Sequence, residues 1–112
     1  YVFIHDIKKT NDEKTWVLAI NPKLHLGLKI QYATKNLPYF MEWKSTAAGD
    51  YVIGLEPSNS SVYGRGYHEE KENLHMLKSF EKEKNELIFT VLDGDEEIQE
   101  EIEKFNRTFK SI

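Results

Sequence analysis

Hydrophobic and polar residues alternate along most of the chain, and a repeat of two residues predicts β-strands. The clearest alternation runs from Leu24 to Ala33, which predicts a strand with one buried face. In the stretch from Lys14 to Ile20 both sides are mostly apolar, which is typical of a strand covered on both faces. The predicted strands span residues 2–5, 14–20, 24–33, 39–44, 51–56, 74–80 and 86–92.

The repeat changes near the C-terminus, where a helix is predicted. Apolar residues recur there at spacings of four, three and four, at Ile98, Ile102, Phe105 and Phe109. This pattern predicts an amphipathic helix from Asp95 to Arg107 whose apolar stripe packs on the sheet. Residues 58–68 are rich in Ser, Tyr and Gly and show no repeat, which predicts a long irregular loop. The predicted fold class is therefore all-β, mainly antiparallel, as a β-sandwich with one short C-terminal helix.

Size and composition indicate one domain of ordinary globular character. The chain has 112 residues, 39% hydrophobic and 30% charged, and a net charge of −4. Basic residues are in excess over residues 1–68 and acidic residues over 69–112, with no basic patch interleaved with aromatics, so no nucleic-acid partner is predicted. No apolar run is long enough for a membrane span, and no membrane partner is predicted. Since no signal peptide is visible and no cysteine is present, we predict a cytoplasmic protein.

The first residues of the chain indicate where the segment comes from, and its histidines bear on which kinds of catalytic or metal site it can hold. Tyr1 already lies in an apolar run, YVFI, which indicates a piece cut from a longer chain. The four histidines, at positions 5, 25, 68 and 75, have no spacing typical of metal ligands, so no metal site and no cofactor are predicted. No pattern of a serine nucleophile with a histidine base is visible, and no glycine-rich phosphate loop precedes a helix pattern.

The stretch GDYVIGLEPSNSSVYGR, residues 49–65, holds the principal candidate, Glu56. Side chains alternate across a strand, so Glu56 shares a face with Gly54. Glycine within a strand often marks a close approach by another group, and Pro57 is expected to hold Glu56 extended and to end the strand. Two interpretations remain open, a solvated strand end and a carboxylate presented beside a gap for a ligand.

Four further residues are candidates for binding a ligand, and each has a structural alternative. Trp43 suits either a platform for the apolar face of a sugar or core packing. Arg65 lies between two glycines and either donates paired hydrogen bonds to ligand oxygens or is solvated. Asn59 follows Pro57 and either contacts a ligand or caps the turn. His5, next to Asp6, is either a polar site residue or a structural histidine.

The runs LPYFMEWK and GDYVIGLEPSNSSVYGR resemble the C-terminal third of the aldose 1-epimerase (galactose mutarotase-like) family. The resemblance is greater to an uncharacterised bacterial branch of that family and covers nearly all of the chain. It also includes the shorter matches VFIHD, Asn21-Pro22, Leu26-Gly27-Leu28 and VLDG at residues 91–94.

The resemblance implies a large β-supersandwich of about three hundred residues, to which this chain would contribute the last strands. It also implies that the carboxylate at Glu56 is the general base that takes the proton from the anomeric hydroxyl of a sugar. A histidine of the family protonates the ring oxygen, the ring opens, and reclosure yields the other anomer. That acid and several sugar ligands lie upstream of Tyr1 in the family, and His5 is not matched to the acid. We therefore expect this segment alone to be inactive.

Three functions follow as alternatives. The chain is part of an isomerase acting on sugar anomers with Glu56 as base, a non-catalytic carbohydrate-binding β-sandwich that uses Trp43, Arg65 and Glu56, or a structural module without a ligand. The expected partner in the first two is a monosaccharide or a sugar derivative. Unpaired edge strands predict self-association of the segment.

Overall fold

The computed structural model describes residues 2–5, 7–47, 49 and 52–109, with side chains from residue 7 onward. Over these residues the chain forms six strands and two helices, and the strands make two antiparallel three-stranded sheets. The chain divides into two compact units, one of Tyr1–Ile7 with Lys35–Lys84 and the other of Lys8–Thr34 with Asn85–Ile112. The predicted class, all-β and mainly antiparallel with a C-terminal helix, is confirmed.

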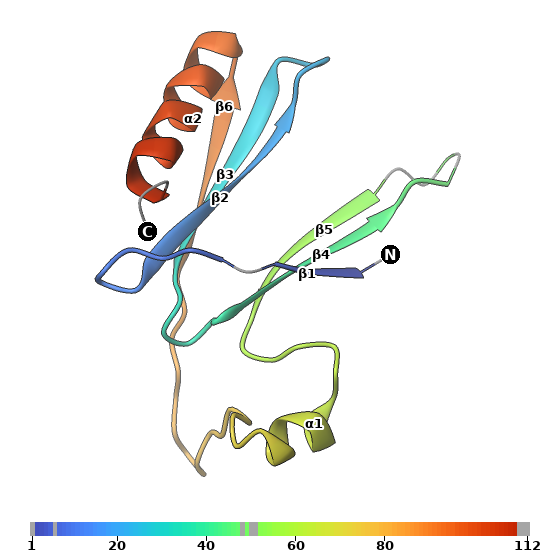
Figure 1. The fold of residues 1–112 in the computed structure, drawn as a ribbon, viewed down its shortest axis with the longest axis vertical. Helices are drawn as coiled ribbons and strands as arrows, with labels where there is room; N and C mark the ends of the chain where they lie inside the picture. The colour runs from blue at the N-terminus through green and yellow to red at the C-terminus, as the bar shows by residue number, and fades with distance from the viewer. Residues whose placement is uncertain (1, 6, 48, 50–51, 110–112) are drawn as a thin grey trace. The chain divides into compact units, whose positions relative to one another are not determined.

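The first unit contains a sheet whose central strand is β4. It pairs β1 (Val2–His5), β4 (Tyr39–Ser45) and β5 (Val52–Ser58) in the order β1-β4-β5, as the ribbon in Figure 1 shows. The polypeptide leaves β5 through a loop to the short helix α1 (Arg65–Glu70). Alternate residues of β4 and β5 share a face, as predicted, so Trp43, Gly54 and Glu56 lie on one face of this pair.

The second unit is a sheet covered on one face by a helix. Its strands are β2 (Lys14–Asn21), β3 (Leu26–Ala33) and β6 (Leu87–Asp93), in the order β2-β3-β6. The helix α2 (Asp95–Phe109) follows β6 directly and runs beside this sheet (Figure 1). Ile30 and Tyr32 of β3 are buried, whereas Leu26 at the start of the strand is exposed. The predicted buried face is therefore buried only along the second half of β3.

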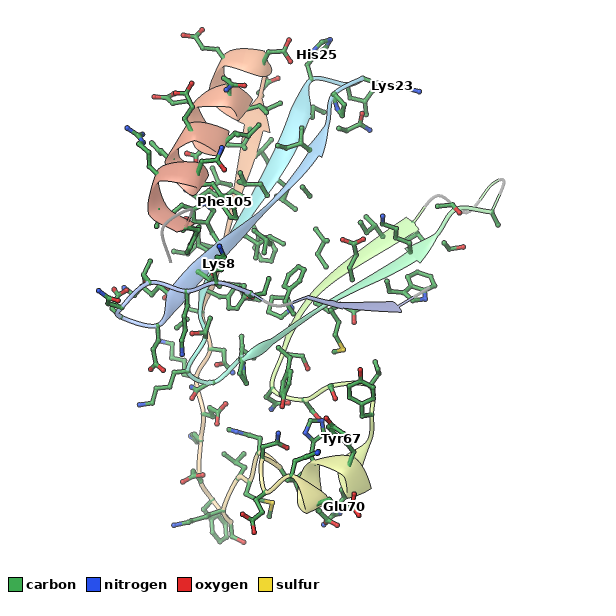
Figure 2. All side chains as sticks on the ribbon, in the orientation of Figure 1. Lys8, Lys23, His25, Tyr67, Glu70 and Phe105 are labelled. Atoms are coloured by element: carbon green, nitrogen blue, oxygen red, sulfur yellow. The ribbon has the colours of Figure 1, made fainter. Side chains whose placement is uncertain are left out.

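The apolar stripe of α2 packs on the sheet, as its spacing predicted. Ile98 and Phe109 are buried, and the Trp16 ring of β2 lies 4.6 Å from the Phe109 ring and 6.2 Å from the Phe105 ring. Figure 2 shows Phe105 on the side of α2 that faces the sheet. The helix begins after Gly94, whose φ of 94° lies in a region that L-residues disfavour, and its first turn is acidic, which suits the positive end of a helix.

A charged pair lies within this packing between helix and sheet. Lys29 Nζ donates a hydrogen bond of 2.9 Å to Glu101 Oε2 and lies 4.8 Å from the centre of the Trp16 ring. The two charged side chains are only 12% and 14% exposed. The hydrogen bond from Lys29, together with the positive charges of Lys29 and Lys104, lowers the pKa of Glu101 below its ordinary value of 4.5.

This pair predicts a pH-dependent contribution to stability. The folded chain keeps Glu101 ionised to lower pH than the unfolded chain does, so the stabilisation is complete above pH 4.5 and is lost as the pH falls through the lowered pKa. Between pH 7 and pH 3, we expect the urea midpoint of the wild type to fall more than that of Glu101→Gln. The exposed Glu103→Gln variant serves as a control and should follow the wild type; equal slopes for all three proteins would contradict the prediction.

Two strand predictions are corrected by the structure. Pro57 does not end β5, because Pro57 pairs with Phe40 and the next residue, Ser58, pairs with Tyr39. The strand β5 lies at the edge of its sheet. Proline is tolerated in edge strands because a backbone nitrogen on the open side of the sheet has no partner strand to donate to. The predicted strand over residues 74–80 is absent, since this segment has no strand partner in the structure and most of its side chains are exposed. Positive φ values at Glu72 and Phe80 interrupt an extended conformation on either side.

The predicted irregular loop over residues 58–68 is also wrong in part, because α1 begins at Arg65. The helix has six residues, too few for a hydrophobic repeat to be visible in the sequence. Its one buried side chain is polar, that of His68. A pattern of apolar positions could not reveal this helix, because a polar network rather than an apolar stripe anchors it.

Candidate functional site

Glu56, Gly54 and Trp43 lie on one face of the β4–β5 pair. The register places Met41 opposite Glu56 and Trp43 opposite Gly54, and directly opposed residues of antiparallel strands share a face. A β-carbon built on Gly54 would lie 2.5 Å from Glu56 Oε1 and 3.6 Å from Trp43 Cβ. The Glu56 carboxylate therefore lies over Gly54, in the space that the side chain of any larger residue at position 54 would fill. Trp43 Cβ borders the same space.

Both an apolar ring and a carboxylate are exposed to solvent on this face. The Trp43 side chain is 39% exposed and Glu56 is exposed, whereas Met41 beside them is buried. Within the described residues, the Glu56 side chain makes no hydrogen bond and no ion pair. Its oxygens are therefore available to accept hydrogen bonds from a ligand, and the exposed part of the indole is available for stacking.

Of the other predicted site residues, neither Arg65 nor Asn59 is joined to this face by a side-chain hydrogen bond or ion pair within the described residues. Arg65 is the first residue of α1, and its Nε donates a hydrogen bond of 2.9 Å to Glu69 Oε1, an exposed pair of the kind that contributes little to stability. Asn59 is exposed in the bend after β5. His5 ends β1 opposite Phe40, and its side chain lies outside the described part of the structure. Trp43 and Glu56 are thus the two predicted residues that the structure brings together.

A second polar cluster, centred on His68 of α1, was not predicted from the sequence. His68 is only 1% exposed, yet both ring nitrogens are hydrogen-bonded. Nε2 lies 2.7 Å from Ser61 Oγ, and Nδ1 lies 2.7 Å from Asn73 Oδ1. Asn73 Nδ2 in turn donates a hydrogen bond of 3.3 Å to the Tyr39 hydroxyl at the start of β4. We call Ser61, His68, Asn73 and Tyr39 the His68 cluster.

Two tyrosine rings contact His68. The His68 ring has its centre 5.1 Å from that of Tyr67 and 5.6 Å from that of Tyr39, both in edge-on contacts. Tyr67 also lies 4.8 Å from the ring of Tyr63, and both tyrosines are exposed. Figure 2 labels Tyr67 on α1, next to the loop that leaves β5. The sequence signal was weak, because the three hydrogen-bonding residues at 61, 68 and 73 come from a helix and two irregular segments.

The described residues form neither a cluster of metal ligands nor a membrane-spanning helix. No group of three or more His, Cys, Asp or Glu side chains there is arranged to hold a metal ion. Neither helix in that part of the chain has the length and apolar character needed to cross a membrane.

The architecture defines an antiparallel all-β protein with a C-terminal helix and an exposed carboxylate beside an exposed indole. Residues 1–91 match the model of a family described as a domain of unknown function, DUF4432. The match spans most of the chain, and the chain belongs to this family. No curated protein and no solved structure matches it.

Proposed function

We propose that the chain is a carbohydrate-binding segment of an aldose 1-epimerase-like protein, in which Glu56 is the general base for the interconversion of sugar anomers. The observation that carries the proposal is the juxtaposition of Glu56 and Trp43 on one face, with Gly54 leaving room for the carboxylate. The run GDYVIGLEPSN, which resembles the mutarotase family, supports the same role. The supersandwich architecture and a cytoplasmic location are part of the proposal.

The chemistry of sugars suits this face. A pyranose ring has an apolar face of C–H groups, which stacks on an aromatic ring, and an edge of hydroxyls, which donate to a carboxylate. A carboxylate that accepts the anomeric hydroxyl proton starts ring opening, and a positioned base contributes about 10² to 10⁴ in rate. Because β5 fixes the backbone of Glu56, its carboxylate can occupy only a limited region near Trp43. A sugar stacked on Trp43 would therefore have this carboxylate beside it.

A second candidate function is non-catalytic carbohydrate binding on the same face. The exposure of Glu56 to solvent favours it, because a general base is commonly tuned by partial burial. In this case the carboxylate only accepts hydrogen bonds from the sugar, and Trp43 provides the stacking surface. The two functions share the ligand and differ in whether Glu56 takes a proton.

Sugar binding is tested first, with Trp43→Ala. We expect free monosaccharides to change the tryptophan fluorescence of the wild type, because one of its two tryptophans is exposed beside Glu56. We also expect Trp43→Ala to weaken the sugar affinity about fivefold or more, since the loss of a stacked ring costs about 1 kcal/mol or more. Isothermal titration calorimetry measures the affinity of both proteins.

The control for this experiment is Phe80→Ala, which removes another exposed aromatic side chain of the same unit. It should bind sugars as the wild type does. A wild type that binds none of the monosaccharides tested, or a Trp43→Ala variant with unchanged affinity, would contradict the proposed site.

A further inference from the structure

We propose that the His68 cluster is a nucleophilic serine site, in which Ser61 attacks carboxylic esters, His68 is the base and Asn73 is a positioning residue. This proposal is independent of the sugar site on β4 and β5. It rests on the hydrogen bonds that determine which His68 nitrogen carries a proton, on the burial of the base, and on the exposed aromatic surface beside it.

The proton arrangement follows from groups that can act only as donors or only as acceptors. Asn73 Nδ2 donates to Tyr39, which leaves Oδ1, an acceptor only, facing His68 Nδ1. Nδ1 therefore carries the proton. The backbone N–H of Ser61, a donor only, lies 3.3 Å from His68 Nε2, so Nε2 presents its lone pair. Ser61 Oγ lies 2.7 Å from Nε2 and donates its hydroxyl proton to the same lone pair.

This is the arrangement required of an activated serine. A nucleophile lies within hydrogen-bond reach of a base, and a third group on the far side of the ring fixes the tautomer and orientation of that base. An asparagine oxygen fills the third role in one known variant of the triad. Here the third group is itself held by Tyr39, which belongs to the central strand of the sheet.

The base, His68, is more buried than the nucleophile, Ser61. A serine site needs this difference, because the base must stay fixed while the nucleophile must be reached by the ester. His68 is almost wholly buried, and its ring contacts Tyr39 and Tyr67, which limits its alternative orientations. Ser61 is half-buried in the irregular segment before α1. The exposed rings of Tyr63 and Tyr67 provide apolar surface for the acyl or aryl part of an ester.

The reaction balances with groups of the chain and water alone. Ser61 Oγ forms a bond to the ester carbonyl carbon while its proton moves to His68 Nε2. Collapse of the tetrahedral adduct breaks the ester C–O bond, and the alcohol leaves with the proton from His68. Water then attacks the acylated serine and gives a proton to His68. The carboxylic acid departs, and Ser61 Oγ regains its proton.

The probe for this site is a fluorophosphonate, whose phosphorus forms a bond to the serine oxygen as fluoride leaves. We expect the folded chain to take up one equivalent at Ser61, located by peptide mass spectrometry. Reaction should be confined to the folded state, because unfolding in urea separates Ser61 from His68. Ser61→Ala should not react, and His68→Gln should react about 100-fold more slowly, since a general base contributes about 10² to 10⁴.

Ser60→Ala, which removes the neighbouring hydroxyl, is the matched control and should react at the wild-type rate. Asn73→Asp keeps an acceptor for Nδ1 and should also react, whereas Asn73→Ala should react slowly. Labelling of the folded wild type that is absent, or equal at Ser60, Ser61 and Ser79, overturns the proposal, and this result requires no variant to fold. Equal rates for folded and urea-unfolded protein overturn it as well.

Discussion

Under the proposed function, replacing Glu56 with glutamine is expected to lower the rate of anomer interconversion about 10² to 10⁴-fold, the usual contribution of a general base. Glutamine has nearly the size of glutamate and still accepts hydrogen bonds, but it cannot take a proton at neutral pH. The sugar affinity should therefore change much less than the rate. Gly54 accommodates the amide as it does the carboxylate, so the substitution leaves the strand intact.

Polarimetry on a freshly dissolved single anomer measures this rate, and Glu70→Gln provides the control. Glu70 is an exposed carboxylate in the same unit, on α1, and its replacement should leave the rate unchanged. A Glu56→Gln protein with the wild-type rate would eliminate Glu56 as the base. Sugar binding by a wild-type protein that shows no interconversion would instead support the non-catalytic binding function.

The largest expected effect on stability is that of Phe109→Ala. Phe109 is 2% exposed and packs against Trp16 and Phe105, so its removal leaves a cavity between α2 and its sheet. Truncation of a buried phenylalanine to alanine costs about 3–5 kcal/mol in the free energy of unfolding. That cost is a large fraction of the stability of an ordinary domain, about 5–15 kcal/mol.

Phe80→Ala is the matched control, because the Phe80 side chain is fully exposed. Substitutions at such surface positions usually change stability by less than about 0.5 kcal/mol. Urea denaturation followed by circular dichroism compares the two variants with the wild type. Equal midpoints for Phe109→Ala and Phe80→Ala would show that α2 does not depend on its aromatic contacts with the sheet.

The fold could be predicted wherever burial on one face left a repeat in the sequence. The spacing of the apolar residues at 98, 102, 105 and 109 predicted α2, and the apolar residues of 14–20 and the alternation in 24–33 predicted two strands of the sheet beside it. The alternation in 86–92 predicted the third strand, β6, which pairs with β3 although all of its residues except Leu92 are exposed. Prediction failed where an alternating segment has neither a buried face nor a partner strand. Residues 74–80 alternate, but Met76, Leu77 and Phe80 are exposed, and no neighbouring strand satisfies their backbone groups in the structure.

The candidate site was predictable to the extent that it depends on strand geometry. Alternation alone placed Glu56 and Gly54 on one face, and Trp43 joined them once the register of β4 and β5 was known. The His68 cluster could not be predicted in the same way. Three of its members, Ser61, His68 and Asn73, approach one another because the chain between residues 61 and 73 folds back on itself, and Tyr39 joins them from β4.

The close approach between Gly54 and Glu56 also limits how this site can vary. A single methyl group on residue 54 would meet a carboxylate oxygen, and the long glutamate side chain would swing away while the strand kept its course. Substitution of Gly54 by alanine would therefore move the Glu56 carboxylate away from Trp43 without changing either residue. The small size of residue 54 thus determines where the carboxylate of residue 56 can lie.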